Sequence, residues 1–360
     1  RATQHRIFKK HIYQSYIVFA KSWITKRTKL NKIVRPMIIS KTPFRIPFAG
    51  GGTDIDFYYK KRIGLFYSVA INQYAYVFLK KRNLDKNFLI QTTSTQFAKS
   101  VDKIEHKLIK ETLKYFNVSD PVHVGVYTTI PTLTGLGSSS SLVVGLINCI
   151  KKLKNLNLTN KQIIDKAYKI ERKICGYKGG WQDQIISQVG GFVKAQISKS
   201  GKYKIIKFKR NKYLERLIKN NLMLVYTEHK RDSSKIISSQ KKNNKLVLKH
   251  YDQIKYIANS LPKILKKKSI SNIANVFNKH WNIKKKLSKE ITNQRINSLY
   301  DFLIKKCNCL GGKLIGAGGG GFFLVVVKNK RNTISLLKKY NINYLNFDIE
   351  NEGSRILKDL

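Results

Sequence analysis

Residues 131–141 form the stretch that most constrains how this chain can fold. They read Pro-Thr-Leu-Thr-Gly-Leu-Gly-Ser-Ser-Ser-Ser. The alternating pattern of residues 122–129 predicts a strand before them, and apolar residues at three- and four-residue spacing predict a helix after them (Leu142, Leu146, Ile150, Leu153). A strand, a glycine turn, a serine cluster and a helix in this order form an anion site. Glycine lets the backbone approach a ligand, and the first helical turn offers unpaired N–H groups. A capped helix would explain one or two serines, but four serines behind Gly-Leu-Gly favour phosphate binding.

The chain is long and strongly basic. Its 360 residues are enough for two domains with cores of their own. The net charge of +51 could indicate nucleic-acid binding, but the lysines are spread along the whole chain and no nucleic-acid-binding motif accompanies them. We therefore interpret the charge as a solvated surface that attracts anionic substrates, without a specific nucleic-acid partner. No apolar run approaches the length of a membrane helix, so we expect no membrane partner.

The cysteines, the lone histidines and the first residues carry weaker signals. Cys149, Cys175, Cys307 and Cys309 lack the spacing of a zinc site, so we expect buried free thiols in a reducing, cytoplasmic compartment. His229 and His280 have no partner spacing, and we predict no catalytic role for them. Met37 stands directly before the first predicted strand, residues 38–40, so we expect the functional domain to begin near it. Residues 1–36 contain no acidic residue and lack the features of a secretory signal, so this basic leader is an upstream remnant, a targeting segment or an artefact.

Three acids stand in positions that need an explanation. Asp54 follows three glycines and Thr53, which indicates either a loop that presents the acid or a plain turn. Glu171 falls within the apolar stripe of a predicted helix, where a carboxylate is costly unless it is paired with a lysine or binds a metal. Asp183 follows two glycines near a predicted helix start, which is a favourable place for any acid. Taken one by one, these acids have structural explanations as good as functional ones.

Three motifs together resemble those of the GHMP kinases, the family of galactokinase, homoserine kinase, mevalonate kinase and phosphomevalonate kinase. They are Thr-Pro-Phe-Arg-Ile at 42–46 continuing to Thr53 and Asp54, the 131–141 stretch, and Leu-Ile-Gly-Ala-Gly-Gly-Gly-Gly-Phe at 314–322. The resemblance covers about residues 37–330. Gly-Trp-Gln-Asp-Gln at 180–184 and Trp-Asn-Ile-Lys-Lys-Lys-Leu-Ser at 281–288 are similar to kinases of D-glycero-D-manno-heptose 7-phosphate.

The resemblance implies an α+β protein with the two-domain GHMP kinase fold. We expect residues 37–205 to form the N-terminal ATP-binding domain, similar to domain 2 of ribosomal protein S5. Residues 206–350 are then the ferredoxin-like C-terminal domain, and residues 1–36 are the leader. The β-α-β pattern near the end of the chain agrees with an α+β layer.

The resemblance also implies roles for individual residues. Asp183 matches the catalytic aspartate, with Arg45 beside it to keep it ionised, and Ser139 and Glu171 match the Mg²⁺ ligands. The ATP-binding residues are Pro131, Gly135, Leu136, Gly137, Ser138, Ser139 and Ser140. The expected sugar-binding residues are Gly52, Thr53, Asp54, Gly318 and Gly319. We add Arg231 as a contact to a substrate phosphate, because the guanidinium group suits phosphate geometry.

Three positions depart from the pattern of the relatives. Ser140 stands where many of them have alanine, and Phe44 replaces the glycine of the general motif, as the heptose kinases allow. Glu228 stands where the heptose kinases have a glycine in a Tyr-Thr-Gly loop.

The implied activity is ATP- and Mg²⁺-dependent phosphorylation of the anomeric hydroxyl of D-glycero-D-manno-heptose 7-phosphate. The 1,7-bisphosphate product would feed the synthesis of nucleotide-activated heptose and surface polysaccharide. The alternatives are a GHMP kinase for another sugar such as fucose, and a catalytically silent regulator that binds sugar and ATP. A basic nucleic-acid-binding protein is disfavoured by the scattered lysines.

Overall fold

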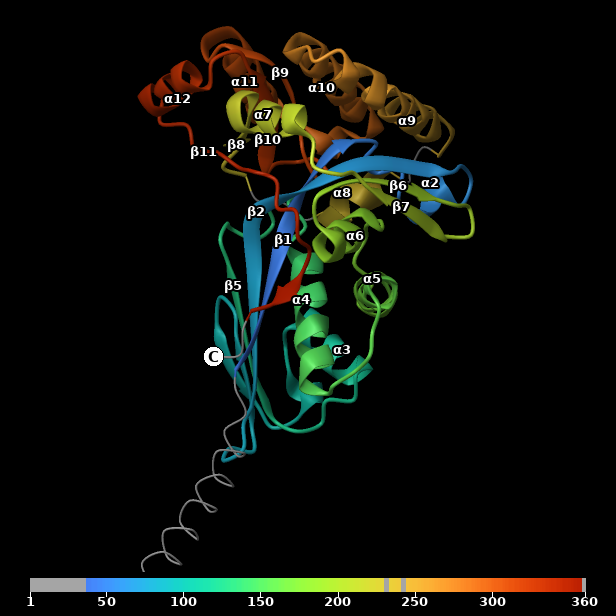
Figure 1. Ribbon diagram of the computed structural model, residues 1–360, viewed down its shortest axis with the longest axis vertical. Helices are drawn as coiled ribbons and strands as arrows, with labels where there is room; N and C mark the ends of the chain where they lie inside the picture. The colour runs from blue at the N-terminus through green and yellow to red at the C-terminus, as the bar shows by residue number, and fades with distance from the viewer. Residues whose placement is uncertain (1–36, 230–232, 241–243, 358–360) are drawn as a thin grey trace, which may run out of the picture. The chain divides into compact units, whose positions relative to one another are not determined.

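Two sheets, both mainly antiparallel, organise the chain (Figure 1). The computed structural model describes residues 37–229, 233–240 and 244–357, so the expected leader and Arg231 lie outside the described residues. The strands are β1 (Ile38–Ala49), β2 (Gly64–Lys81), β3 (Phe88–Gln91), β4 (Thr95–Ala98), β5 (Val122–Thr128), β6 (Phe192–Ile197), β7 (Tyr203–Lys207), β8 (Leu222–Tyr226), β9 (Cys309–Leu314), β10 (Phe322–Val327), β11 (Tyr344–Leu345) and β12 (Arg355–Ile356). The α-helices are α2 (Asp56–Tyr59), α3 (Lys107–Tyr115), α4 (Ser138–Leu153), α5 (Asn160–Tyr168), α6 (Gln182–Val189), α7 (Lys212–Asn221), α8 (Ser233–Ser239), α9 (Asn244–Lys266), α10 (Ile270–Lys284), α11 (Gln294–Lys306) and α12 (Lys330–Lys339).

The larger sheet has the strand order β12-β1-β2-β5-β3-β4, with β6 paired to β2 and β7 paired to β6. Among the described strands, β3 and β5 are the only parallel pair. The smaller sheet has the order β11-β8-β10-β9 and is antiparallel throughout. This topology confirms the α+β prediction, since a doubly wound fold would need a mainly parallel sheet.

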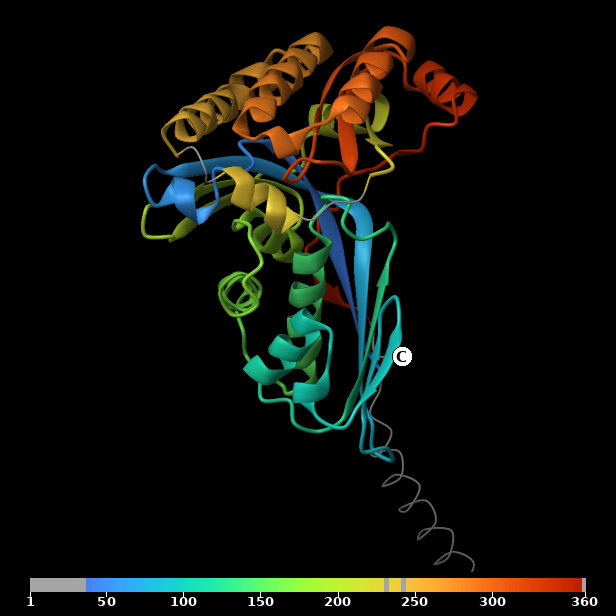
Figure 2. The same cartoon turned by 180° about the vertical axis from the view of Figure 1, so that it is seen from behind.

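Helices cover each sheet with their apolar sides. In the larger sheet α4 lies along β1 and β2, with α3, α5 and α6 beside it (Figures 1 and 2). In the smaller sheet α10 packs against β9, and α9 packs against both α10 and the strands β1 and β2. No helix among the described residues is both long enough and apolar enough to cross a membrane.

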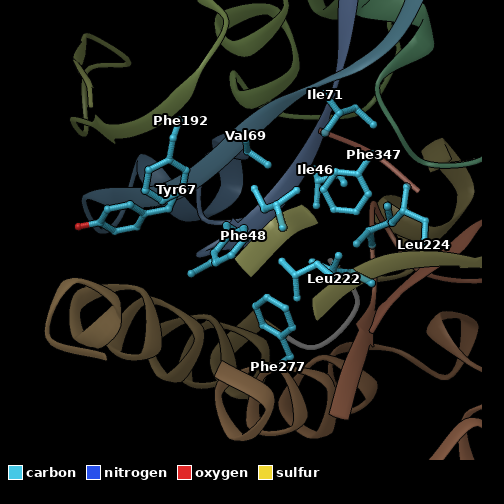
Figure 3. Packing of buried hydrophobic residues seen from close by; sticks show 14 of the residues in the cluster. Ile46, Phe48, Tyr67, Val69, Ile71, Phe192, Leu222, Leu224, Phe277 and Phe347 are labelled. Carbon is cyan, nitrogen blue, oxygen red and sulfur yellow. The ribbon is translucent and has the colours of Figure 1, made fainter. Parts of the chain in front are cut away.

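One hydrophobic cluster joins the two sheets (Figure 3). Ile46 and Phe48 of β1 belong to the same buried group as Leu222 of β8 and Phe277 of α10. The rings of Phe48 and Phe277 meet edge to face, with centroids 5.3 Å apart. Each fully buried side chain of this size contributes about 1.5–3 kcal/mol of transfer free energy. The cluster therefore fixes the end of β1 against α10, and both elements contribute residues to the cavity described below.

Most predicted elements are present, but some bounds differ. The sequence pattern predicts two strands at residues 64–71 and 74–78, whereas the structure has one long strand, β2. Leu261-Pro262 predicts that a helix ends near residue 260, whereas α9 continues through Pro262 to Lys266. The helix that carries Glu171 changes at Lys169–Ile174 into a π-helix, which turns Ile174 outward to 40% exposure while Cys175 is buried.

All four cysteines are buried and free, as predicted.

Candidate active site

The predicted phosphate loop opens onto a cavity of about 530 Å³. It connects β5 to α4, and Gly137 caps α4 with a φ of 86°, in the region that favours glycine. Gly135, Gly137, Ser138 and Ser139 line the cavity at the N-terminus of α4. The helix end supplies unpaired N–H groups and the positive end of its dipole, so this wall suits phosphate.

The remaining predicted loop residues have other positions. Leu136 is buried in the core, and its carbonyl oxygen accepts a hydrogen bond from the backbone N–H of Arg45 at 3.1 Å. Pro131 is exposed at the start of the loop, where its carbonyl oxygen accepts a hydrogen bond from Thr134 at 2.9 Å. These residues shape the loop rather than face the cavity.

Arg45 of β1 and Asp183 of α6 form an ion pair on the cavity wall. Oδ1 of Asp183 lies 2.7 Å from both Nε and Nη2 of Arg45. Nη1 of the same arginine donates to the carbonyl oxygen of Gly135 at 2.6 Å, which ties the pair to the phosphate loop. A Cβ atom on Gly137 would lie 3.6 Å from Cγ of Asp183, so the loop backbone passes next to the carboxylate. This geometry places a carboxylate and a cation beside the loop that the sequence predicts to bind phosphate.

Glu171 lies in the π-helix and is fully buried. Its Oε1 accepts a hydrogen bond from Ser139 at 2.6 Å and lies 3.1 Å from Nη1 of Arg172. Its Oε2 accepts hydrogen bonds from Ser140 at 2.5 Å and from Gln184 at 2.6 Å. Four donors thus compensate the burial of one carboxylate. Ser140, which departs from the alanine of many relatives, adds one of these donors.

Asp54 lines the same cavity, and two backbone N–H groups hold its carboxylate in place. Gln182 donates to Oδ2 at 2.8 Å and Gly52 donates to Oδ1 at 3.1 Å. Burial raises the pKa of Asp54; the backbone N–H of Gln182 opposes this shift, and the charge of Asp183 adds to it. Asp54 therefore lies in the cavity close to Asp183, and its carboxyl group can hydrogen-bond a ligand hydroxyl.

Gly180 is required for this arrangement. A Cβ atom there would overlap the carboxylate of Asp54 and would lie 2.6 Å from the backbone oxygen of Asp54. We expect Gly180→Ala to lower the free energy of unfolding by about 1–3 kcal/mol, because the backbone must shift to relieve the overlap. Urea denaturation of Gly180→Ala measures the effect. In the control Gly125→Ala the added Cβ lies 3.4 Å from the Phe78 side chain, an ordinary contact. An equal change in both variants would contradict the assigned role of Gly180.

The other predicted sugar-binding residues are placed differently. Thr53 is buried and donates to the carbonyl oxygens of Gly50 and Leu65, so it stabilises the loop that presents Asp54. Gly318 packs against Ile291 and Gly319 against Ile236, and the N–H of Gly319 donates to the carbonyl oxygen of Ile291 at 2.7 Å. The cavity wall from this loop consists of Gly316 and Ala317.

The position of Glu228 explains why glycine would suit it. Its φ is 57°, in the left-handed region. The side chain lies 3.3 Å from Nη2 of Arg295 and accepts a hydrogen bond from Asn343 at 3.2 Å. In this chain Glu228 therefore combines a backbone conformation that favours glycine with two polar contacts of its side chain.

Several cavity residues escaped the sequence prediction. Arg172 lies 3.7 Å from Asp183 as well as close to Glu171, and its position next to Glu171 in the sequence was the available signal. Gln182 lines the cavity with its Nε2 buried and without a hydrogen-bond partner. His280, Lys284 and Lys313 line the wall formed by α10 and β9. His280 and Lys284 lie four residues apart on α10, but Lys313 follows 29 residues later on β9, so no sequence motif connects it to them.

Comparison with known proteins gives matches in both halves of the chain. The family model of the GHMP kinases N terminal domain matches residues 103–191, which include the phosphate loop, Glu171 and Asp183. The model of the GHMP kinases C terminal matches residues 262–344, which include the second glycine cluster.

Individual proteins are similar to most of the chain. The D-glycero-alpha-D-manno-heptose 7-phosphate kinase of Campylobacter jejuni is 29% identical over 336 residues, which are 88% of this chain and 97% of that protein. The mevalonate kinase of Methanocaldococcus jannaschii is 27% identical over 65% of this chain and 70% of its own length. The structure of a D-glycero-D-manno-heptose 1-phosphate kinase from Bacteroides thetaiotaomicron has a TM-score of 0.74 at 23% identity, covering 89% of this chain and 99% of that one. The last comparison supports the fold.

Proposed function

Because this chain belongs to the GHMP kinase family, we propose that it transfers the γ-phosphoryl group of ATP to the anomeric hydroxyl of D-glycero-D-manno-heptose 7-phosphate. The observation that carries this proposal is the convergence on one cavity of the phosphate loop, the Arg45–Asp183 pair and Ser139, which bonds Glu171. The full-length similarity to a heptose 7-phosphate kinase supports the choice of sugar. The product would be the 1,7-bisphosphate, a precursor of nucleotide-activated heptose for surface polysaccharide.

Phosphoryl transfer depends on positioning and charge neutralisation more than on covalent chemistry. The N–H groups at the start of α4 bind the ATP phosphates, next to the side chain of Arg45. Asp183 orients the anomeric hydroxyl and accepts its proton as the oxygen attacks. Arg45 holds the carboxylate of Asp183 in place and stabilises negative charge on the transferred group. Asp54 and Gln182 bind sugar hydroxyls on the same wall.

The residues around Glu171 fit a Mg²⁺ ion. The oxygen atoms of Ser139 and Glu171 lie 2.6 Å apart, and Mg²⁺ is commonly bound by one or two protein oxygens together with substrate phosphates. A bound Mg²⁺ would neutralise charge on the β- and γ-phosphates. We also place the reaction in the cytoplasm, where ATP is available and the free cysteines stay reduced.

An ATP-consumption screen tests the proposal. The purified protein is incubated with Mg-ATP and a panel that contains heptose 7-phosphate, heptose, fucose, galactose, mannose 6-phosphate and mevalonate. We expect heptose 7-phosphate to have the highest kcat/KM of the panel. A preference for fucose or another free sugar would assign a different sugar kinase. ATP binding without consumption for any acceptor would favour a regulatory protein.

A further inference from the structure

A buried basic cluster lies on the cavity wall that the C-terminal half contributes. It consists of His280 and Lys284 of α10 and Lys313 of β9. The exposed fractions are 4% for His280, 7% for Lys284 and 1% for Lys313. Three basic side chains buried this deeply are costly unless they have partners or a ligand.

His280 has no hydrogen-bond partner. Both ring nitrogens are buried without a donor or acceptor in reach, although the side chain lines the cavity. Burial lowers the pKa of His280, and the charges of Lys313 and Lys284 lower it further. A buried polar group without a partner costs free energy, so these nitrogens indicate a missing ligand.

Lys313 has only weak compensation for its charge. Its ammonium group donates to the carbonyl oxygen of Phe48 at 2.7 Å and lies 5.0 Å from the ring centre of Phe277. Burial lowers the pKa of Lys313 to about 7. No carboxylate in the described part of the chain forms an ion pair with Lys313 or His280. An anion bound here would supply the missing counter-charge.

Lys284 has a different role. Its ammonium group donates to the carbonyl oxygens of Leu314 at 2.8 Å and Gly316 at 2.6 Å, so it fixes the start of the glycine turn. It adds positive potential to the site while its hydrogen bonds hold the turn.

The cluster and the Arg45–Asp183 pair contact β1 at different points along the strand. Lys313 contacts Phe48, which lies three residues beyond Arg45 on β1. A strand rises about 3.3 Å per residue, so the backbone positions of Arg45 and Phe48 are on the order of 10 Å apart. Both groups line the same cavity, so one elongated ligand can contact the cluster and Asp183 at the same time.

We propose that His280 and Lys313 bind the phosphate group that the sugar already carries, while Asp183 faces the hydroxyl at the other end. This inference rests on the proposed function, because it takes a sugar phosphate as the substrate. It replaces the expectation for Arg231 with residues whose positions are described. The competing explanation is a structural cluster in which Lys313 only ties β9 to β1.

Selectivity for the phosphate distinguishes the two explanations. The values of kcat/KM for heptose 7-phosphate and for unphosphorylated heptose are measured in the wild type, His280→Ala and Lys313→Met. We expect a loss of about tenfold to a hundredfold for the phosphorylated sugar, as for a lost hydrogen bond to a charged group, with no change for heptose. The control Lys279→Met removes the charge of the exposed neighbour of His280 and should change neither value. Equal losses for both sugars would show that the cluster is structural.

A binding experiment separates this inference from the proposed function. The melting temperature is measured with and without inorganic phosphate, with the nucleotide site saturated by a non-hydrolysable ATP analogue and Mg²⁺. Phosphate should raise the melting temperature of the wild type and of Lys279→Met, but not of His280→Ala or Lys313→Met. If this pattern appears without heptose 7-phosphate turnover, the anion site stands and the proposed substrate fails. If heptose 7-phosphate is turned over but His280→Ala and Lys313→Met keep the phosphate effect and the selectivity, the anion site is wrong.

Discussion

Asp183→Asn should lower kcat by at least about a hundredfold, because a side chain that moves a proton in the transition state contributes about a hundredfold to ten-thousandfold to the rate. The substitution keeps the shape of the side chain and removes its charge. The protein should remain folded and bind Mg-ATP, since the phosphate loop and Glu171 are unchanged. The measurement is kcat per folded molecule, together with ATP affinity by calorimetry.

Stability alone does not separate the possible roles of Asp183. An acid that only favours a helix start contributes about 0.3–1 kcal/mol. The structure adds a second effect, because the variant deprives the buried Arg45 of its partner, and breaking such a pair can cost several kcal/mol. The control is Asp165→Asn, which removes an acid of α5 that pairs with the exposed Lys161. Near-normal kcat in Asp183→Asn would exclude the catalytic assignment.

Glu171→Gln should raise the Mg²⁺ concentration needed for half-maximal activity by at least about tenfold, because even indirect metal partners affect affinity by 10–100-fold. The amide also deprives Arg172 of its negatively charged partner. Because the side chain of Arg172 is only 7% exposed, we expect the free energy of unfolding to fall by about 3–5 kcal/mol. A titration of activity against Mg²⁺ at fixed ATP measures the first effect, and urea denaturation measures the second.

Glu350→Gln is the matched control for Glu171→Gln. Glu350 has a side chain that is 12% exposed, accepts a hydrogen bond from Tyr74 and pairs with Arg355, outside the residues that line the cavity. This variant should lose stability and keep the wild-type dependence on Mg²⁺. If Glu171→Gln also keeps that dependence, the carboxylate is a structural anchor for Ser139 and Ser140.

The fold was largely predictable because its signals are local. Glycine turns and apolar periodicity act over a few residues, and so does Thr159-Asn160-Lys161-Gln162, a pattern that is typical of a capping box and predicts a helix start. In the structure α5 begins there, at Asn160, with both hydrogen bonds of the capping box present. The π-helix at Lys169–Ile174 was not predictable from a period of 3.6 residues. It turns Glu171 toward Ser139 and exposes Ile174, so tertiary contacts override the expected stripe.

The site was predictable where its residues belong to motifs. Arg45, Asp183 and Ser139 each lie in a motif, and the structure brings all three to the cavity. His280 and Lys313 come from different elements and become neighbours only through the packing of α10 on β9. A histidine without partner spacing gave no signal, and the proposal for His280 depends on its burial without a hydrogen-bond partner, which only the structure reveals.

The phosphorus NMR spectrum of the product identifies the hydroxyl that receives the phosphoryl group. The protein is incubated with Mg-ATP and D-glycero-D-manno-heptose 7-phosphate, and the new signal is assigned by its coupling to the sugar protons. We expect a phosphate coupled to the anomeric proton, beside an unchanged 7-phosphate, and no such signal with Asp183→Asn. A new phosphate at any other carbon, or none from the wild-type protein, would rule out the proposed reaction.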